Sequence, residues 1–251
     1  MSPARPSTLE VDGVTGRDHF LKAAIFDVDG VLLASPHERA WREALTGFAD
    51  PEGFTTAVYQ AEVAGKPRLD GARAALAALG VVDAGARAGD YAKAKQARLE
   101  ALIQAGAVEA FPDALRLVAA IAAIGLPMAV ASSSKNANAM MEPIELPSGG
   151  RLLDAFAANV CGRDLKHGKP DPEIFRLAAV ELRIAPAACL VAEDASAGVE
   201  AARAGGMTAL GVARLGDGAA LRAAGADLVV TSLDEIPIGE LRHGRLRRYP
   251  A

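Results

Sequence analysis

The feature that most constrains the fold of this chain is the regular alternation of short apolar runs with amphipathic segments after residue 112. Runs of four to six apolar residues are typical of buried strands, and the segments between them have helical periodicity. Strands are expected at 128–131, 157–161, 189–192, 207–212 and 228–231, and helices at 113–124, 136–141, 172–182, 196–204 and 218–223. This alternation predicts an α/β fold, a Rossmann-like parallel sheet core with helices on both faces.

One further strand precedes this alternating part and is separated from it by a long helical stretch. Residues 22–28 form an apolar run that ends in acidic residues, which predicts a buried parallel strand. From 36 to about 104 the apolar spacing is helical, with helices expected at 38–45, 55–63, 71–79 and 90–103. We therefore expect a core of 18–34 and 108–240, an inserted all-helical cap of 35–107, and flexible tails at 1–17 and 241–251.

Charge and hydropathy exclude two classes of partner. A net charge of −4 and a pI near 5.6 argue against nucleic acid, because phosphate backbones require a basic face. No stretch approaches the ~20 apolar residues of a membrane span, and residues 1–17 lack the apolar run of a signal peptide. The expected location is the cytoplasm. The two cysteines, Cys161 and Cys189, lie in apolar runs and are expected to be buried thiols.

Two carboxylates, Asp27 and Asp29, lie at the end of the first predicted strand. Because strand side chains alternate with a period of two, both leave the strand on the same side. One can attack phosphorus while the other moves a proton, and Gly30 permits a tight departure of the chain toward the cap. Asp-x-Asp-Gly also opens calcium loops, but the apolar run 31–33 and Ser35 do not suit a solvated loop.

Three more sets of polar residues follow the later strands. Residues 132–136, Ser-Ser-Ser-Lys-Asn, offer hydroxyls and helix amides to an anion, or else cap a helix without a ligand. Lys169 lies between Gly and Pro and suits a fixed cation beside phosphate; an exposed loop lysine is the alternative. Glu193 and Asp194 place two acidic side chains at a strand end, which is energetically unfavourable unless a cation such as Mg²⁺ lies beside them. Ligands bind beyond the carboxyl ends of parallel strands, so these sets of residues predict a ligand-binding site at that edge of the sheet.

The four sets, in this order, resemble the four motifs of the haloacid dehalogenase superfamily over residues 23–234. The resemblance implies a phosphoryl-transfer enzyme in which Asp27 forms a phosphoaspartate and Asp29 is the general acid and base. It also implies contacts from Ser132 and Lys169 to the transferred phosphoryl group. The implied Mg²⁺ ligands are Asp27, Asp29 through its backbone carbonyl, Asp194 and, in an assisting role, Glu193.

The cap is similar to that of the β-phosphoglucomutase branch of the superfamily. In that branch a cap arginine and a Ser-Lys-Asn group surround the phosphate that is not transferred, while a cap histidine and lysine orient the sugar. The matching residues are Arg68 with Ser134, Lys135 and Asn136, and His37 with Lys95. A mutase needs such a second clamp because it holds a bisphosphate at both ends. Taken singly, the three cap residues would also suit solvated helices.

The chain departs from that pattern at four places. The link from Asp29 to His37 is shorter, Ala34 replaces an acidic residue, Ala195 stands where the mutase has Ser, and 143–152 is an insert. The function expected from the resemblance is a phosphohexomutase that interconverts a β-sugar 1-phosphate and the 6-phosphate through a bisphosphate. The alternatives are a sugar-phosphate phosphatase with the same residues and a binding protein that has lost catalysis. The presence of all four sets argues against a binding protein that has lost catalysis.

Overall fold

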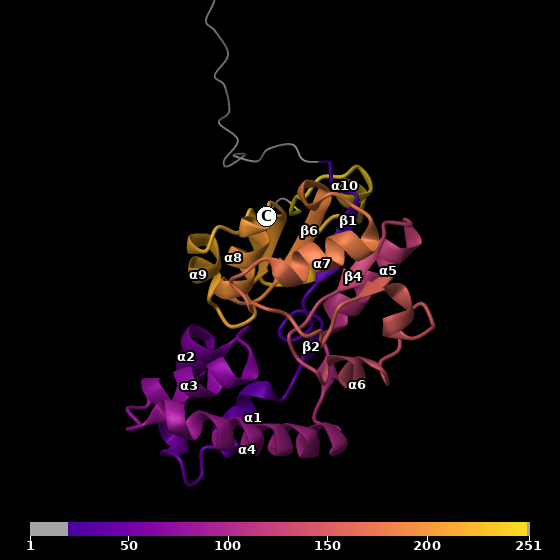
Figure 1. Ribbon diagram of the computed structural model, residues 1–251. Helices are drawn as coiled ribbons and strands as arrows, with labels where there is room; N and C mark the ends of the chain where they lie inside the picture. The colour runs from indigo at the N-terminus through magenta and orange to yellow at the C-terminus, as the bar shows by residue number, and fades with distance from the viewer. Residues whose placement is uncertain (1–19, 250–251) are drawn as a thin grey trace, which may run out of the picture.

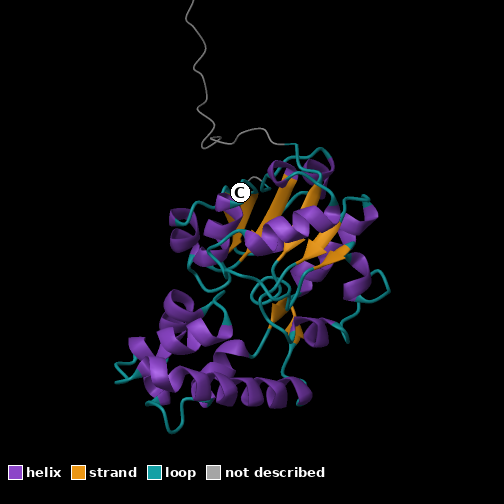
Figure 2. Ribbon diagram, in the orientation of Figure 1, coloured by secondary structure: helices purple, strands orange, loops and turns teal. Residues whose placement is uncertain are grey.

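The computed structural model describes residues 20–249, and its core is a six-stranded parallel sheet (Figures 1 and 2). The strands are β1 (Ala23–Phe26), β4 (Met128–Val130), β5 (Ala158–Asn159), β6 (Cys189–Glu193), β7 (Thr208–Val212) and β8 (Leu228–Val230). Their order across the sheet is β5-β4-β1-β6-β7-β8, and every neighbouring pair is parallel. The predicted α/β class is confirmed, and β1 lies inside the sheet with its carboxyl end beside those of β4 and β6.

Helices cover both faces of the sheet, as the alternation predicted. They are α5 (Pro112–Ala123), α6 (Ala137–Met141), α7 (Glu173–Leu182), α8 (Ser196–Ala204), α9 (Gly218–Ala223) and α10 (Ile238–Arg242). In β1, Ala24 and Phe26 join the hydrophobic cluster that includes α5, α6 and α10, whereas Ala23 and Ile25 join the one that includes α7, α8 and α9. The period-two pattern of the strand thus explains why both of its faces are apolar.

The inserted stretch is helical throughout and lies to one side of the sheet, toward the bottom of Figure 1. Its helices are α1 (His37–Glu43), α2 (Thr56–Val58), α3 (Arg68–Ala78) and α4 (Ala84–Gln104), with a 3₁₀ turn at Pro51–Gly53 and a π-helical turn at Tyr59–Val63. Between 36 and 104, all of which the structure describes, there is no strand. These helices pack on a hydrophobic cluster of their own, built around Trp41 and Tyr91.

The chain crosses between the core and the helical insert twice, and a small antiparallel sheet joins these two crossings. It pairs β2 (Leu33–Ala34) with β3 (Glu109–Ala110), in the register Leu33 to Ala110. The sequence analysis did not predict these strands, because two residues are too few for a period-two pattern to be seen. The pairing holds the end of the turn after Asp29 beside the chain that enters α5.

The C-terminal segment differs from the expectation of a flexible tail. Leu241 is buried, the backbone N–H of Leu21 donates to the carbonyl of Gly244 over 2.8 Å, and that of Tyr249 donates to Glu235 over 2.9 Å. Part of the predicted tail is therefore held on the core. The other predicted tail, 1–17, lies outside the described residues. Among the described residues, no helix combines the length and apolarity required to cross a membrane.

Replacing Tyr91 by Phe tests the packing inside the helical insert. The Tyr91 hydroxyl donates to the backbone carbonyl of Trp41 over 2.8 Å, and the Tyr91 side chain is fully buried. We expect Tyr91→Phe to lower the free energy of unfolding by about 1 kcal/mol, the usual value of a lost buried hydrogen bond. Urea unfolding followed by circular dichroism measures the change. The control is Tyr249→Phe, at a residue that is 55% exposed; an equal loss in the two variants would contradict the expectation.

Candidate active site

A cavity of about 530 Å³ opens beyond the carboxyl ends of the central strands, between the core and the helical insert. Open parallel sheets bind their ligands at this edge, beyond the carboxyl ends of the strands. All twelve candidate residues from the sequence line it: Asp27, Asp29, His37, Arg68, Lys95, Ser132, Ser134, Lys135, Asn136, Lys169, Glu193 and Asp194. The structure therefore gathers residues from seven separate segments around one cavity.

Lys169 lies at the buried end of the cavity between two carboxylates. Its ammonium donates to Oδ1 of Asp27 over 2.6 Å and to Oε1 of Glu193, and all three side chains are buried. Burial opposes the positive charge, but the two carboxylates outweigh it and raise the pKa of Lys169. The lysine is thus a fixed cation, as predicted from its position between Gly168 and Pro170.

Glu193 uses both of its carboxylate oxygens inside the protein. Oε1 accepts from Lys169, and Oε2 accepts from the backbone N–H of Asp194 over 3.1 Å and of Ala195 over 3.3 Å. The carboxylate lies against the first turn of α8, where a Cβ added to Gly198 would come within 2.0 Å of its Cδ. Glycine at this position therefore leaves the space in which Glu193 holds Lys169.

The buried end of the cavity has the donors that a divalent cation requires. Carboxylate oxygens of Asp27, Glu193 and Asp194 lie within 4.8 Å of one another. Burial and then the neighbouring carboxylates raise the pKa of Asp194 well above its ordinary value. Three carboxylates beside one ammonium leave an excess of negative charge, and oxygen ligands suit Mg²⁺. The residues present therefore fit the ion that the sequence predicted.

Gly30 brings the chain close to this cluster. Its φ of +76° is the left-handed conformation that glycine adopts without strain. A Cβ here would lie 1.9 Å from Oδ2 of Asp194. The tight departure expected at Gly30 is confirmed, and the same glycine leaves room for the Asp194 carboxylate.

Asp29 lies on the cavity side of the turn and is not clamped as Asp27 is. Its Oδ1 is buried without a hydrogen-bond partner among residues 20–249, and Nε2 of His37 lies 3.6 Å from it. Burial raises the pKa of Asp29, although Ser35 and Lys95 oppose the shift. A carboxyl group that can be protonated and has an unpaired oxygen suits proton exchange with a ligand.

The helical insert reaches Asp29 through His37 and Lys95. Nζ of Lys95 lies 2.7 Å from Nδ1 of His37, whose Nε2 lies 3.3 Å from Oγ of Ser134. Burial, followed by the charge of Lys95, holds the pKa of His37 well below its ordinary value, so the ring is neutral. When Lys95 is protonated it donates to Nδ1, and the ring proton is then on Nε2, which faces Asp29 and Ser134. Burial also lowers the pKa of Lys95 to about 7, although Asp29 opposes the shift.

A second polar group lies on the cavity wall and joins three segments. Arg68 of α3 donates to Oε1 of Gln96 on α4, and Nε2 of Gln96 donates to Oδ1 of Asn136 over 3.2 Å. Gln96 was not among the predicted residues, since no pattern distinguishes it from other polar residues of a long helix. Lys135 donates to Asp164, another residue that lines the cavity, over 2.8 Å, and 65% of its side chain is exposed.

Tyr59 is a further cavity residue that the sequence analysis missed. It begins the π-helical turn Tyr59–Val63, a distortion that is frequent at functional sites. Burial, then the negative charges of Asp29 and Asp194, raise the pKa of its phenol well above the ordinary value. The sequence indicated only a regular helix over 55–63, because a π-turn has no clear sequence pattern.

Comparisons with known proteins show what this chain is similar to. The family model of haloacid dehalogenase-like hydrolases matches residues 21–206. A β-phosphoglucomutase of Mycobacterium tuberculosis is 34% identical over 260 residues (92% of this chain, 98% of the relative). Hexitol phosphatase A of Escherichia coli is 30% identical over 227 residues (89% and 96%). The crystal structure of a β-phosphoglucomutase from Pyrococcus sp. strain ST 04 has a TM-score of 0.68 at 28% identity (87% and 96%).

Substituting Gly198 tests the packing beneath Glu193. In Gly198→Ala the new methyl group would overlap the Glu193 carboxylate and push it from Lys169. We expect a loss of about 1–3 kcal/mol in the free energy of unfolding, as for other overpacked sites, and a fall in phosphate-ester cleavage. Gly89→Ala, inside α4 with open space around it, is the matched control and should stabilise the protein by about 0.5–1 kcal/mol. Urea unfolding and steady-state assays of both variants measure the difference; a neutral Gly198→Ala would contradict this account.

Proposed function

This chain belongs to the haloacid dehalogenase-like hydrolase family, in its β-phosphoglucomutase branch, and we propose that it is a Mg²⁺-dependent phosphohexomutase. The proposed reaction interconverts a β-sugar 1-phosphate and the corresponding 6-phosphate. The observation that carries the proposal is the hydrogen-bonded group of Arg68, Gln96 and Asn136 on the cavity wall. With Ser134, these side chains would bind the phosphate that is not transferred. A mutase needs that second anchor because its intermediate is a bisphosphate that must bind in two orientations.

Asp27 would be the nucleophile that takes the phosphoryl group. Lys169, 2.6 Å from Oδ1 of Asp27, would offset negative charge during the transfer. Ser132 Oγ accepts from the backbone N–H of Ser134 over 3.1 Å, so its own hydrogen can donate to a phosphoryl oxygen. Asp29 would protonate the leaving sugar oxygen and later take the proton of the attacking hydroxyl. The neutral His37, held by Lys95, would orient a sugar hydroxyl toward Asp29.

The Asp27 and Asp194 carboxylates, with the backbone carbonyl of Asp29, would hold Mg²⁺. Glu193 would not bind the ion directly, because its oxygens already accept from Lys169 and from backbone amides. It would instead hold these neighbouring groups in place around the ion. When bound, Mg²⁺ offsets the negative charge of the phosphoryl oxygens.

A sugar-phosphate phosphatase is the second candidate, and the similarity to hexitol phosphatase A favours it. In that reaction water, and not a sugar hydroxyl, would attack the phosphoaspartate. The two reactions differ in how well the site excludes water from Asp27. His37, which is held by Lys95, contacts Ser134 and so ties the helical insert to the core; this supports the mutase, because it keeps the insert over the site.

Asp27→Asn is expected to abolish phosphoryl transfer and leave the fold intact. The amide cannot form an acyl phosphate, and removal of a nucleophile costs several orders of magnitude in rate. The measurements are circular dichroism and single-turnover phosphorylation of the protein. Substantial turnover by a folded Asp27→Asn protein would refute the assignment.

Arg68→Ala is expected to separate the two candidate functions. Loss of a charge-assisted hydrogen bond to phosphate costs roughly 1.5–3 kcal/mol, so mutase turnover of β-glucose 1-phosphate with trace bisphosphate should fall about ten- to a hundredfold. Phosphorylation of Asp27 by acetyl phosphate, which has no second phosphate, should change little. The control is Arg73→Ala on the same helix, where the exposed Arg73 pairs with Asp70.

The products of this assay decide between the candidates. Glucose 6-phosphate as the main wild-type product supports the mutase, whereas stoichiometric free phosphate would favour the phosphatase. An equal loss with acetyl phosphate and with the sugar phosphate in Arg68→Ala would mean that Arg68 only supports the helical insert, and would remove the main support for the mutase.

A further inference from the structure

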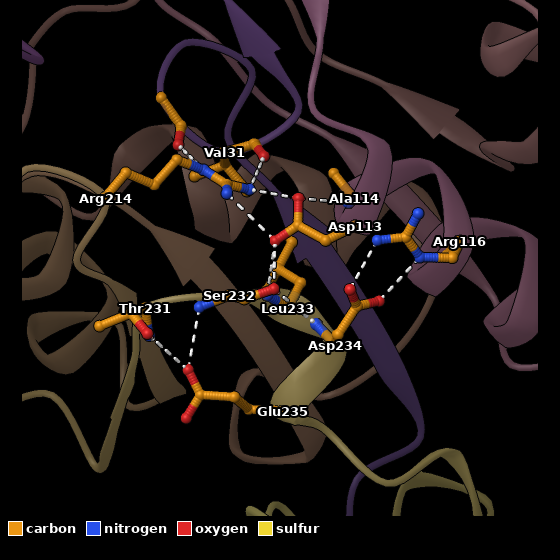
Figure 3. A network of polar contacts seen from close by, with 11 residues as sticks. Val31, Asp113, Ala114, Arg116, Arg214, Thr231, Ser232, Leu233, Asp234 and Glu235 are labelled. Carbon is orange, nitrogen blue, oxygen red and sulfur yellow. Dashed lines mark hydrogen bonds and ion pairs between the residues drawn. The ribbon is translucent and has the colours of Figure 1, made fainter.

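Arg214, which follows β7, binds the turn after the two catalytic carboxylates (Figure 3). Its Nε donates to the carbonyl of Gly30 over 2.9 Å, and its Nη2 donates to that of Val31 over 3.0 Å. Its side chain is only 14% exposed and lines the cavity. One guanidinium therefore holds two successive carbonyls immediately after Asp29.

The other edge of the Arg214 guanidinium is held by Asp113 in the first turn of α5. Nη1 and Nη2 each donate to one carboxylate oxygen of Asp113 over 3.1 Å. Asp113 also accepts from the Ser232 hydroxyl over 2.9 Å and from the backbone N–H of Leu233 over 2.7 Å. The guanidinium carbon lies 3.7 Å from the ring centroid of Phe111, in the second crossing. Arg214 is thus fixed on its other edge and on one face.

The position of Asp29 depends on the turn that Arg214 binds. The N–H of Gly30 donates to Leu33 over 2.9 Å, and the N–H of Leu33 donates to Val28 over 2.9 Å. Asp29 lies within this closed turn, between the end of β1 and the two carbonyls that Arg214 holds. The turn continues into β2 and then α1, so any displacement of the helical insert would pull on it.

We propose that Arg214 is a positioning residue that holds the turn, and with it Asp29, in place for proton transfer. The inference rests on the proposed role of Asp29 as general acid and base. A planar guanidinium can bind two carbonyls on one edge and a carboxylate on the other, which the single ammonium of a lysine cannot do. Asp27 is held separately by Lys169 and by its backbone N–H, which donates to Ala192 over 3.1 Å. Loss of Arg214 should therefore affect proton transfer more than nucleophilic attack.

The proposed role makes the effect depend on the leaving group. Protonation by Asp29 matters when the leaving oxygen is strongly basic, as in phenyl phosphate or a sugar phosphate. It matters little for p-nitrophenyl phosphate, whose leaving group departs as a stable anion. A residue that only stabilises the fold would change the two rates by the same factor.

The test compares Arg214→Met with Arg116→Met. Arg116 belongs to the same network and donates to both carboxylate oxygens of Asp234 over 2.9 and 2.6 Å (Figure 3), but it lies at the exposed end, away from the turn. Single-turnover release of phenol and of p-nitrophenol is measured with Mg²⁺ for the wild type and each variant. For Arg214→Met we expect phenol release to fall by about 10²-fold, the lower end of a general acid's contribution, with p-nitrophenol release near the wild-type rate. Arg116→Met should match the wild type with both esters.

The possible outcomes separate this inference from the proposed function. Equal loss with both esters in a folded Arg214→Met protein, or the same selective loss in Arg116→Met, would overturn the positioning role. If Arg214→Met does not fold by circular dichroism, Arg214→Lys keeps the charge and should show the same selective loss; an unselective loss there overturns the proposal. A wild-type protein that releases neither phenol nor p-nitrophenol would overturn the proposed phosphoryl transfer, and this inference with it.

Discussion

Lys169 lies beneath the cavity with its ammonium between the carboxylates of Asp27 and Glu193, and all three groups are buried. Buried charges of this kind are tolerated only when each is paired and hydrogen-bonded. The pairing brings together the ends of β1 and β6 and the loop before α7, so these segments must meet at one depth. Gly198 leaves the space that Glu193 needs for this contact. The site is thus built around a fixed cation beside the Asp27 carboxylate.

Asp27 and Asp29 are two residues apart but lie in different surroundings. Asp27 contacts the fixed cation, whereas Asp29 has an oxygen without a hydrogen-bond partner among the described residues and faces His37 of the helical insert. One carboxylate is therefore suited to attack and the other to proton transfer, the division of labour that different environments impose on paired carboxylates. Because His37 and Lys95 come from the insert, the surroundings of Asp29 depend on where the insert lies.

The turn between these carboxylates and the insert is held on the core. β2 and β3 pair across the two crossings, and Arg214 joins the turn to Asp113 at the start of α5. Both crossings are thus tied to the core close to Asp29. Any displacement of the helical insert would therefore act on the turn that contains Asp29.

The sequence alone determined the α/β class and predicted polar residues that the structure places around one cavity. Alternating apolar runs predicted the strands, and because parallel strands end at one edge, Asp27, Ser132, Lys169 and Asp194 were expected around one cavity, where the structure has them. Only the tertiary structure revealed Gln96, Tyr59 and Arg214. Arg214 is 184 residues from Gly30, and Gln96 is 40 residues from Asn136. Local periodicity reports which face of an element is buried, but the partner of a polar side chain on another element depends on how the elements pack.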